Sequence, residues 1–211
     1  MIPALPDPVG DPVNEVPNVN VPNALTLVRL LCVPVFIWLF TNSHDNDMVR
    51  WLCDIVFLAA ALTDIVDGHL ARRDGLVTNF GKIADPIADK LLTGSALIAL
   101  SIEGSIAWWI TVLILGREIF ITGLRFWVIR RGVIPASRGG KAKTASQITA
   151  IVALLIPTAS LQASPVVPDV LVWLQRATAD VALTFAVALT VVTAIDYVAK
   201  SRALLKQEIS R

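Results

Sequence analysis

Six stretches of mainly apolar residues follow one another along the chain, with short polar segments between them. They cover residues 24–40, 49–72, 80–101, 107–129, 144–161 and 170–198. Each approaches or exceeds the roughly 20 residues that a helix needs to cross the hydrocarbon core of a bilayer. The last is long enough to predict a tilt, or a break near residues 176–180. Because the connections are short, the pattern predicts an all-α integral membrane protein with six transmembrane helices packed antiparallel in one bundle.

The overall composition agrees with a membrane protein. Hydrophobic residues make up 55% of the 211 residues, charged residues 17%, and the mean hydropathy is +0.68. A soluble domain has about 25% charged residues. The formal net charge is only +1, which gives no reason to expect nucleic acid as a partner. Cys32 and Cys53 lie in apolar stretches without a CxxC pattern, which argues against a zinc site or a disulfide framework.

The chain divides into one helical domain with a tail at each end. Residues 1–22 contain six of the 12 prolines and no lysine or arginine, which is typical of a disordered tail. They have neither the basic start nor the apolar run of a secretory signal, so we expect no cleavage. Residues 23–200 form the predicted six-helix domain, and residues 201–211 a basic C-terminal tail.

Lysine and arginine residues are distributed unequally between the two sides of the predicted bundle. Most lie next to span ends that share a side with both termini, whereas the opposite side has little beyond Arg50 and Arg176. The positive-inside rule places the side with more cations in the cytoplasm. We therefore expect both termini in the cytoplasm, and a multi-pass protein of the plasma membrane.

Four aspartates lie inside the second and third spans, where ionisable residues are costly and by default mark function. Asp64 and Asp67 share one helix face, Asp85 and Asp89 share another, and a connection of a few residues folds the two helices back on each other. The four carboxylates are therefore expected to converge near the cytoplasmic surface. Oxygen ligands of this kind suit magnesium or manganese better than zinc or copper.

The aspartates belong to a longer pattern. It reads Asp64-x-x-Asp67-Gly68-x-x-Ala71-Arg72, then eight residues, then Gly81-x-x-x-Asp85-x-x-x-Asp89. This pattern resembles the signature of the CDP-alcohol phosphatidyltransferases, with every position filled. The resemblance implies an enzyme that transfers the phosphatidyl group of CDP-diacylglycerol to an alcohol and releases CMP. It also implies a homodimer.

The resemblance assigns roles to these residues. Two divalent ions, Mg²⁺ or Mn²⁺, are expected on Asp64, Asp67, Asp85 and Asp89, and Asp89 resembles the general base toward the acceptor hydroxyl. The expected CDP-diacylglycerol site is formed by Asp64, Asp67, Gly68, Ala71, Arg72, Thr78 and Gly81.

A second group of cations points to an anionic acceptor. Arg117, Arg125, Lys141 and Lys143 supply more positive charge than one diphosphate with two metal ions requires, so we expect them to bind an acceptor phosphate. Together with the stretches at residues 23–29 and 85–90, they resemble the branch of the family that uses sn-glycerol 3-phosphate and forms phosphatidylglycerophosphate. A sibling branch that uses inositol phosphate or another alcohol is the alternative.

Other interpretations of the same residues remain. Asp64 and Asp67 also suit an ion pair with Arg72, and Arg117 also suits a structural pair with Glu118. Lys141 and Lys143 also suit a topology signal. A cation transporter needs acidic residues near the midplane and discontinuous helices. A membrane prenyltransferase is expected to carry DDxxD-like clusters, which this chain lacks.

Overall fold

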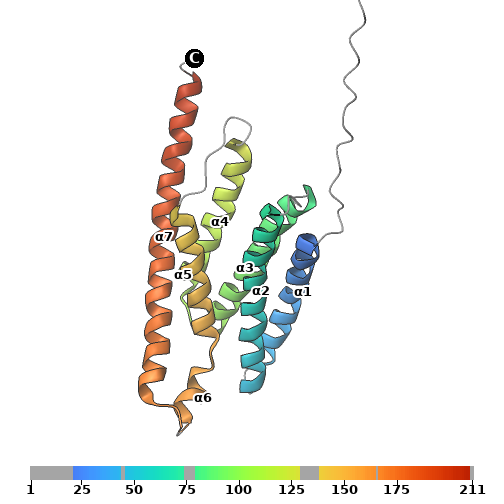
Figure 1. Ribbon diagram of the computed structural model, residues 1–211. Coiled ribbons are helices and arrows are strands. Elements are labelled where there is room, and N and C mark those ends of the chain that lie inside the picture. Colours follow the sequence, from blue (N-terminus) through green and yellow to red (C-terminus); the bar gives the residue numbers. More distant parts are fainter. Residues whose placement is uncertain (1–20, 44–45, 74–78, 129–137, 165, 210–211) are drawn as a thin grey trace, which may run out of the picture.

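The computed structural model describes residues 21–43, 46–73, 79–128, 138–164 and 166–209 (Figure 1). Within these residues the regular structure is entirely helical, as predicted. The helices are α1 (Val21–Thr41), α2 (Asp47–Arg73), α3 (Asn79–Glu103), α4 (Trp108–Val128), α5 (Arg138–Leu155), α6 (Thr158–Ala163) and α7 (Asp169–Ile209). The predicted N-terminal tail lies outside the described residues, except that its last two residues begin α1.

The first four helices lie within a few residues of the predicted spans, but the fifth differs. α5 begins at Arg138 and ends at Leu155, and the short helix α6 follows it. Hydropathy alone missed the beginning because the first turns of α5 are polar. The helix ends before Pro157, which has no N–H group and disfavours a helical conformation of the residue before it.

The last helix is longer and more regular than the sequence predicted. α7 runs for 41 residues with no break near residues 176–180, which leaves a tilt as the other predicted way to accommodate its length. It contains no glycine or proline, and the charged pair of Arg176 and Asp180 does not interrupt the backbone hydrogen bonds of a helix. α7 also includes residues 201–209, most of the predicted C-terminal tail.

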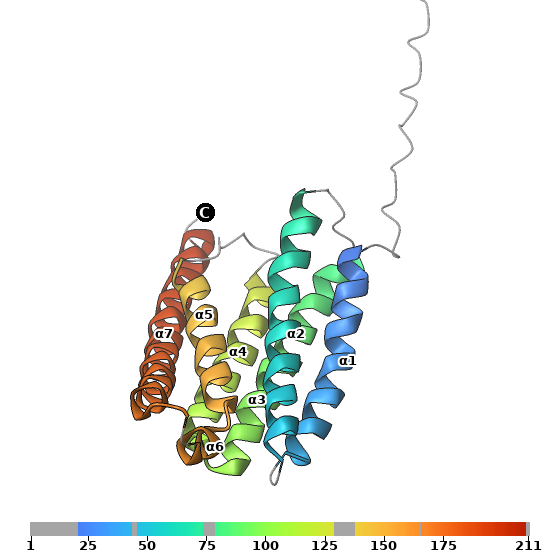
Figure 2. The same cartoon turned by 60° about the horizontal axis from the view of Figure 1, so that its bottom comes forward.

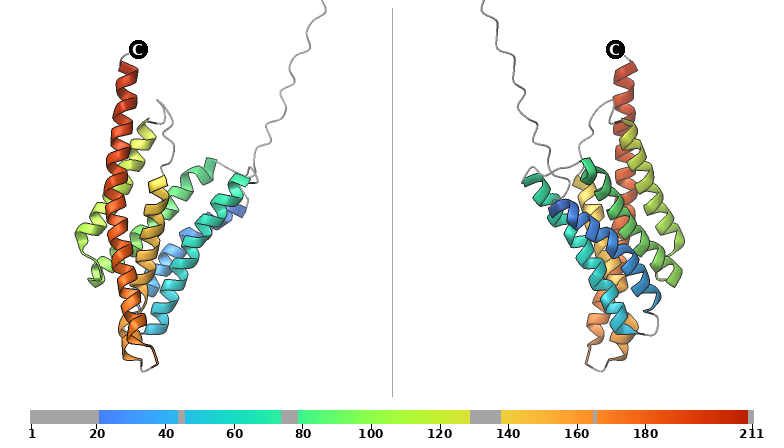
Figure 3. Two further views of the ribbon diagram at one scale, coloured as in Figure 1. Left: turned by 60° about the vertical axis from the view of Figure 1, so that its left-hand side comes forward. Right: turned by 90° about the vertical axis from the view of Figure 1, so that its right-hand side faces the viewer.

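Consecutive long helices run antiparallel, and α1 lies at one side of the bundle against both α2 and α3 (Figures 1 and 2). α5 packs along α7, and α4 connects α3 to α7. Figure 3 shows that α7 extends along the full height of the bundle. We call the end that carries the start of α1 and the end of α7 the near end, and the opposite one the far end. The near end also carries the end of α2 and the starts of α3 and α5.

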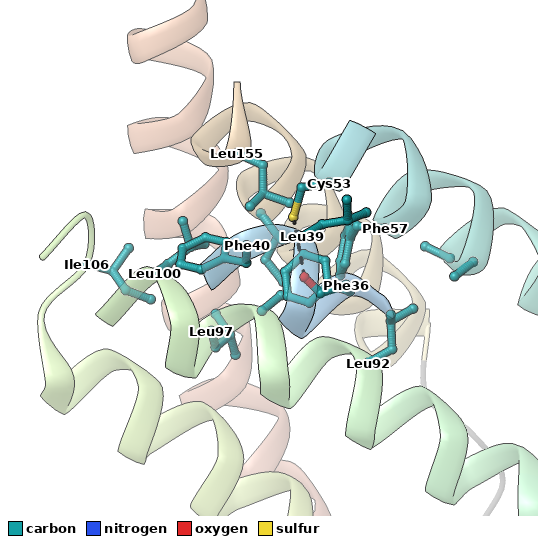
Figure 4. Close-up of a cluster of buried hydrophobic side chains, with 14 of the residues drawn as sticks. Phe36, Leu39, Phe40, Cys53, Phe57, Leu92, Leu97, Leu100, Ile106 and Leu155 are labelled. Carbon is teal, nitrogen blue, oxygen red and sulfur yellow. Dashed lines mark hydrogen bonds between the residues drawn. The ribbon is translucent and has the colours of Figure 1, made fainter. Parts of the chain in front are cut away.

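The apolar core is formed mainly by the far-end parts of α1, α2, α3 and α5. Figure 4 shows its side chains around Phe36. Phe36 contacts Phe40 and Phe57, with 5.9 Å between ring centroids in both pairs. Beside them Arg50 donates from Nε to the carbonyl oxygen of Leu155 at 2.7 Å. Its guanidinium binds both carboxylate oxygens of Glu103, at 2.8 and 2.9 Å. Arg50 therefore joins α2, α3 and α5 at the far end.

The outward faces of the bundle are apolar, as a membrane protein requires. Two of the described helices are long and apolar enough to be candidate membrane spans, at Asn23–Thr41 and Asp169–Ser201. In α2, α3 and α4 charged residues interrupt the apolar stretch, and in α5 they lie in the first turns. Exposed tryptophans gather at the far end on α1, α2, α4 and α7: they are Trp38, Trp51, Trp108, Trp109 and Trp173. Tryptophan is enriched at this depth of a membrane protein, where the bilayer meets water.

Candidate active site

Two of the four predicted metal-binding aspartates have side chains that the structure describes, and both lie near the start of α3. Asp85 and Asp89 are one helical turn apart and both are partly buried. The hydroxyl of Thr26, on α1, donates a hydrogen bond to Oδ1 of Asp85. Thr26 is 1% exposed, so water does not compete for this contact. The hydroxyl therefore fixes the orientation of one carboxylate of the predicted site.

Thr26 belongs to a buried polar face of α1. Asn23, Thr26 and Arg29 recur at a spacing of three residues and are all nearly inaccessible to solvent. Arg29 donates from Nε to the carbonyl oxygen of Ala60 on α2, at 3.3 Å. α1 thus joins the two aspartate-bearing helices through polar contacts. From the sequence, this stretch supported only the resemblance to the glycerol 3-phosphate branch, although polar residues three apart in an apolar span are a detectable signal.

The second half of the predicted aspartate site lies on α2, which stays helical through Arg73. Asp64, Asp67, Gly68, Ala71 and Arg72 therefore keep the helical spacing on which the prediction depends. Their side chains lie outside the described part of the structure, and so does all of Thr78. Among the described side chains, no group of three or more acidic, histidine or cysteine residues could hold a metal ion. Convergence of the four aspartates stays a prediction.

The donor atoms that α3 supplies do fit a hard divalent cation. Asp85 and Asp89 offer carboxylate oxygens from adjacent turns, and Gly81 is buried one turn before Asp85. Mg²⁺ and Mn²⁺ prefer such oxygen ligands. The carboxylate oxygens of Asp85 and Asp89 are therefore suitable ligands for such an ion. The hydrogen bond from Thr26 holds Asp85 in place.

A cluster of four charged residues lies next to these carboxylates along α3. Glu118 on α4 forms ion pairs with Lys90 at 3.2 Å and Arg117 at 3.1 Å, and with Lys143 on α5. Lys90 directly follows Asp89. We call Glu118, Lys90, Arg117 and Lys143 the Glu118 cluster. Its side chains are between 6% and 28% exposed, so the ion pairs are largely shielded from water.

Arg117 also connects the cluster to α7. Its Nη2 donates to the hydroxyl of Thr193 at 2.8 Å, and that hydroxyl donates to the carbonyl oxygen of Leu189 at 2.5 Å. The predicted pair of Arg117 and Glu118 is therefore present, but as part of a network that joins α3, α4, α5 and α7.

The structure brings together only some of the residues predicted to bind the acceptor phosphate. Arg117 and Lys143 share the carboxylate of Glu118, whereas Lys141 is exposed. The side chain of Arg125 lies outside the described part. Sequence reasoning assigned no acceptor role to Lys90 or Glu118, although charges this deep in apolar spans are the signal that marks them.

One further polar group lies on the same side of α5 as Lys143. Gln147 follows it by one turn and is 4% exposed. Its Oε1 is buried and has no hydrogen-bond partner within the described part of the chain. A buried acceptor without a donor is costly, which makes this atom a candidate contact for a ligand hydroxyl.

The sequence was compared with known protein families and proteins. The sequence model of the CDP-alcohol phosphatidyltransferase family matches residues 19–192. The chain belongs to this family. The matched region includes all four aspartates and the whole Glu118 cluster, so the resemblance drawn from the motif is confirmed. Membership makes the protein a phosphatidyltransferase and a membrane enzyme.

Several curated relatives cover most of the chain. A protein of Mycobacterium tuberculosis named "Probable phosphatidylglycerophosphate synthase" is 46% identical over 183 residues, 86% of this chain and 81% of the relative. A protein of Bacillus subtilis named "CDP-diacylglycerol--glycerol-3-phosphate 3-phosphatidyltransferase" is 38% identical over 198 residues, 89% of this chain and 97% of the relative. A Rickettsia typhi protein of the same name is 41% identical over 138 residues, 65% of this chain and 76% of the relative.

Proposed function

We propose that the protein transfers the phosphatidyl group of CDP-diacylglycerol to sn-glycerol 3-phosphate, forming phosphatidylglycerophosphate and CMP. The family membership and the names of the relatives from M. tuberculosis and B. subtilis support this reaction. The structural observation that carries it is the position of Lys90, which directly follows Asp89 on α3 and forms an ion pair with Glu118 in a cluster with surplus positive charge. A nucleotide diphosphate with metal ions and a phosphate-bearing acceptor require such neighbouring sites.

The donor site in this proposal consists of the motif residues. Enzymes of this family generally use divalent metal ions. Two Mg²⁺ or Mn²⁺ ions held by Asp64, Asp67, Asp85 and Asp89 would screen the diphosphate and stabilise charge on departing CMP. Arg72 and Thr78 contact the cytidine diphosphate, and the small residues leave room for it. These small residues are Gly68, Ala71 and Gly81.

The transfer step requires an activated hydroxyl. Asp89 accepts the proton of the acceptor hydroxyl as its oxygen forms a bond to the phosphorus of the phosphatidyl group. The phosphoanhydride bond to CMP breaks in the same substitution, and CMP leaves with the bonding electron pair. Arg117 and Lys143 hold the acceptor's phosphate through charge-assisted hydrogen bonds. Arg125 and Lys141 complete the proposed acceptor set, with Lys141 at its exposed edge.

We further propose that the six long helices cross the plasma membrane, with the near end and both termini in the cytoplasm. Three observations support this arrangement. The cations of the loops are concentrated at the near end, the exposed tryptophans gather at the far end, and the outward faces are apolar. The lipid tails of both substrate and product then stay in the bilayer. In this proposal, residues 23–200 form the helical domain and carry a tail at each end. The protein assembles as a homodimer.

The test is an acceptor competition. Purified protein is given CDP-diacylglycerol, Mg²⁺ and equal concentrations of glycerol 3-phosphate, inositol 1-phosphate, inositol and serine. We expect CMP release to depend on acceptor, to stop in chelator, and to yield phosphatidylglycerophosphate as the main product. Preference for an inositol compound or serine would refute the acceptor assignment. CMP release that continues in chelator would refute the metal assignment.

A further inference from the structure

The Glu118 cluster contains three positive charges from three helices around a single carboxylate. Lys90 belongs to α3, Arg117 to α4 and Lys143 to α5. Oε1 of Glu118 pairs with Arg117 and Lys143, and Oε2 pairs with Lys90. The cluster therefore carries two surplus positive charges. It already holds one anionic group, which belongs to the protein itself.

A phosphate that binds to Arg117 and Lys143 must share them with this carboxylate. Lys143 is 6% exposed and its ammonium contacts Glu118 directly, so a phosphate oxygen and the Glu118 oxygen compete for the same donor. Lys90 is the most exposed cation at 28%, which leaves that edge of the cluster accessible. In a site shielded from water, neither anion is screened from the other.

We propose that Glu118 is a specificity-determining positioning residue of the acceptor site. It holds the three cations together while the site is empty, and the phosphate of the acceptor displaces it from Lys143 and Arg117 on binding. The carboxylate remains close to Lys90 after this exchange. Affinity for phosphate is thereby lower than that of a cluster of three unopposed cations.

The moderate affinity has a role in turnover. Under the proposed function, on which this step rests, the phosphate of glycerol 3-phosphate is retained in the product. A site that bound this phosphate through three unopposed cations would also retain the product. When the product leaves, the carboxylate of Glu118 pairs again with Lys143 and Arg117 and takes the place of the phosphate. This lowers the free-energy cost of product release. The two surplus positive charges of the cluster also balance the charge of a phosphate dianion. The site should therefore favour an acceptor with a phosphate group over a neutral alcohol.

Replacement of Glu118 by glutamine separates its charge from its shape. The glutamine amide oxygen still accepts hydrogen bonds from Lys143 or Arg117, but it no longer competes as an anion. The matched control is Glu103→Gln. Glu103 binds Arg50 in a comparable ion pair at the far end, away from the cluster. Any general effect of losing the carboxylate of an ion pair between helices is common to both variants.

The measurement uses inorganic phosphate as the probe and needs no turnover. Phosphate is titrated into the detergent-purified wild-type protein and both variants, and its dissociation constant is obtained from calorimetry or from the dependence of Tm on phosphate. We expect Glu118→Gln to bind phosphate roughly tenfold more tightly than wild type, which is about 1.4 kcal/mol. Glu103→Gln should bind it as wild type does. Unchanged or weaker binding by Glu118→Gln would overturn the proposal, because a merely structural carboxylate predicts that result.

Two additions keep the test decisive. If Glu118→Gln does not yield folded protein, Glu118→Asp takes its place. Its carboxylate is one methylene shorter and should hold the cations less closely, so phosphate should bind more tightly than to wild type, and weaker or unchanged binding overturns the proposal. Glycerol 3-phosphate turnover is then measured separately. A wild-type protein that binds phosphate but prefers another acceptor refutes the proposed acceptor and not the role of Glu118.

Discussion

Replacing Thr26 by valine removes one hydroxyl from the buried contact between α1 and α3 and keeps the size of the side chain. The hydroxyl donates to Asp85, a proposed metal ligand, and it is almost inaccessible to solvent. A hydrogen bond to a charged group contributes about 1.5–3 kcal/mol, and 1.4 kcal/mol corresponds to a factor of ten. If this free energy supports the carboxylate in its metal-binding orientation, Thr26→Val should weaken metal binding roughly 10- to 100-fold.

The assay follows CMP release at saturating CDP-diacylglycerol and glycerol 3-phosphate over a range of Mg²⁺ concentrations. Thr26→Val should raise the Mg²⁺ concentration for half-maximal activity by that factor, with partial recovery of the rate at high Mg²⁺. Thr26→Ser retains the hydroxyl and is the matched control, with a dependence near that of wild type. If Thr26→Val had the Mg²⁺ dependence of wild type and a lower rate at every concentration, the contact would be structural and the reasoning wrong.

Three further predictions concern other parts of the molecule. Asp89→Asn should slow the chemical step about 10²- to 10⁴-fold with little change in CDP-diacylglycerol affinity, and an equal loss in both would identify Asp89 as mainly a ligand. Lys143→Gln should raise the KM for glycerol 3-phosphate far more than Lys141→Gln does, because of these two lysines only Lys143 is buried in the Glu118 cluster. Equal increases in KM in steady-state kinetics would contradict this. Arg50→Met should lower the Tm by several degrees, at about 2–4 °C for each kcal/mol, with the KM of both substrates unchanged.

Hydropathy predicted a helix correctly wherever the apolar run and the helix end at nearly the same residues. α1 to α4 agree with the predicted spans because polar residues and turns follow each run closely. α5 was misplaced because its first turns carry Arg138 and Lys143, which hydropathy treats as loop residues. α7 is continuous, whereas the length of the last apolar run predicted either a tilt or a break near residues 176–180. Charged residues lower hydropathy without preventing helix formation, so they do not mark a helix end.

The candidate site shows a similar division between local and long-range information. Spacing within one helix predicted that Asp85 and Asp89 share a face, because that depends only on helical geometry. It also raised the pairing of Arg117 with Glu118, which are neighbours in the chain. Contacts of Glu118 with Lys90 and Lys143 depend on how three helices pack. The sequence pattern carries no direct information on that packing, and the same holds for the contact of Thr26 with Asp85.

The way Arg50 joins three helices has a consequence for the local stability of the bundle. At the far end, its contacts with Glu103 and Leu155 combine with the aromatic core, so separation of the helices there exposes a buried charge and apolar surface together. At the near end, polar contacts and ion pairs join the helices, but less apolar surface is buried between them than in the core at the far end. Amide hydrogens of the aspartate-bearing turns should therefore exchange before those around Phe57. We therefore expect the near end, where the proposed site lies, to open locally before the helices separate at the far end.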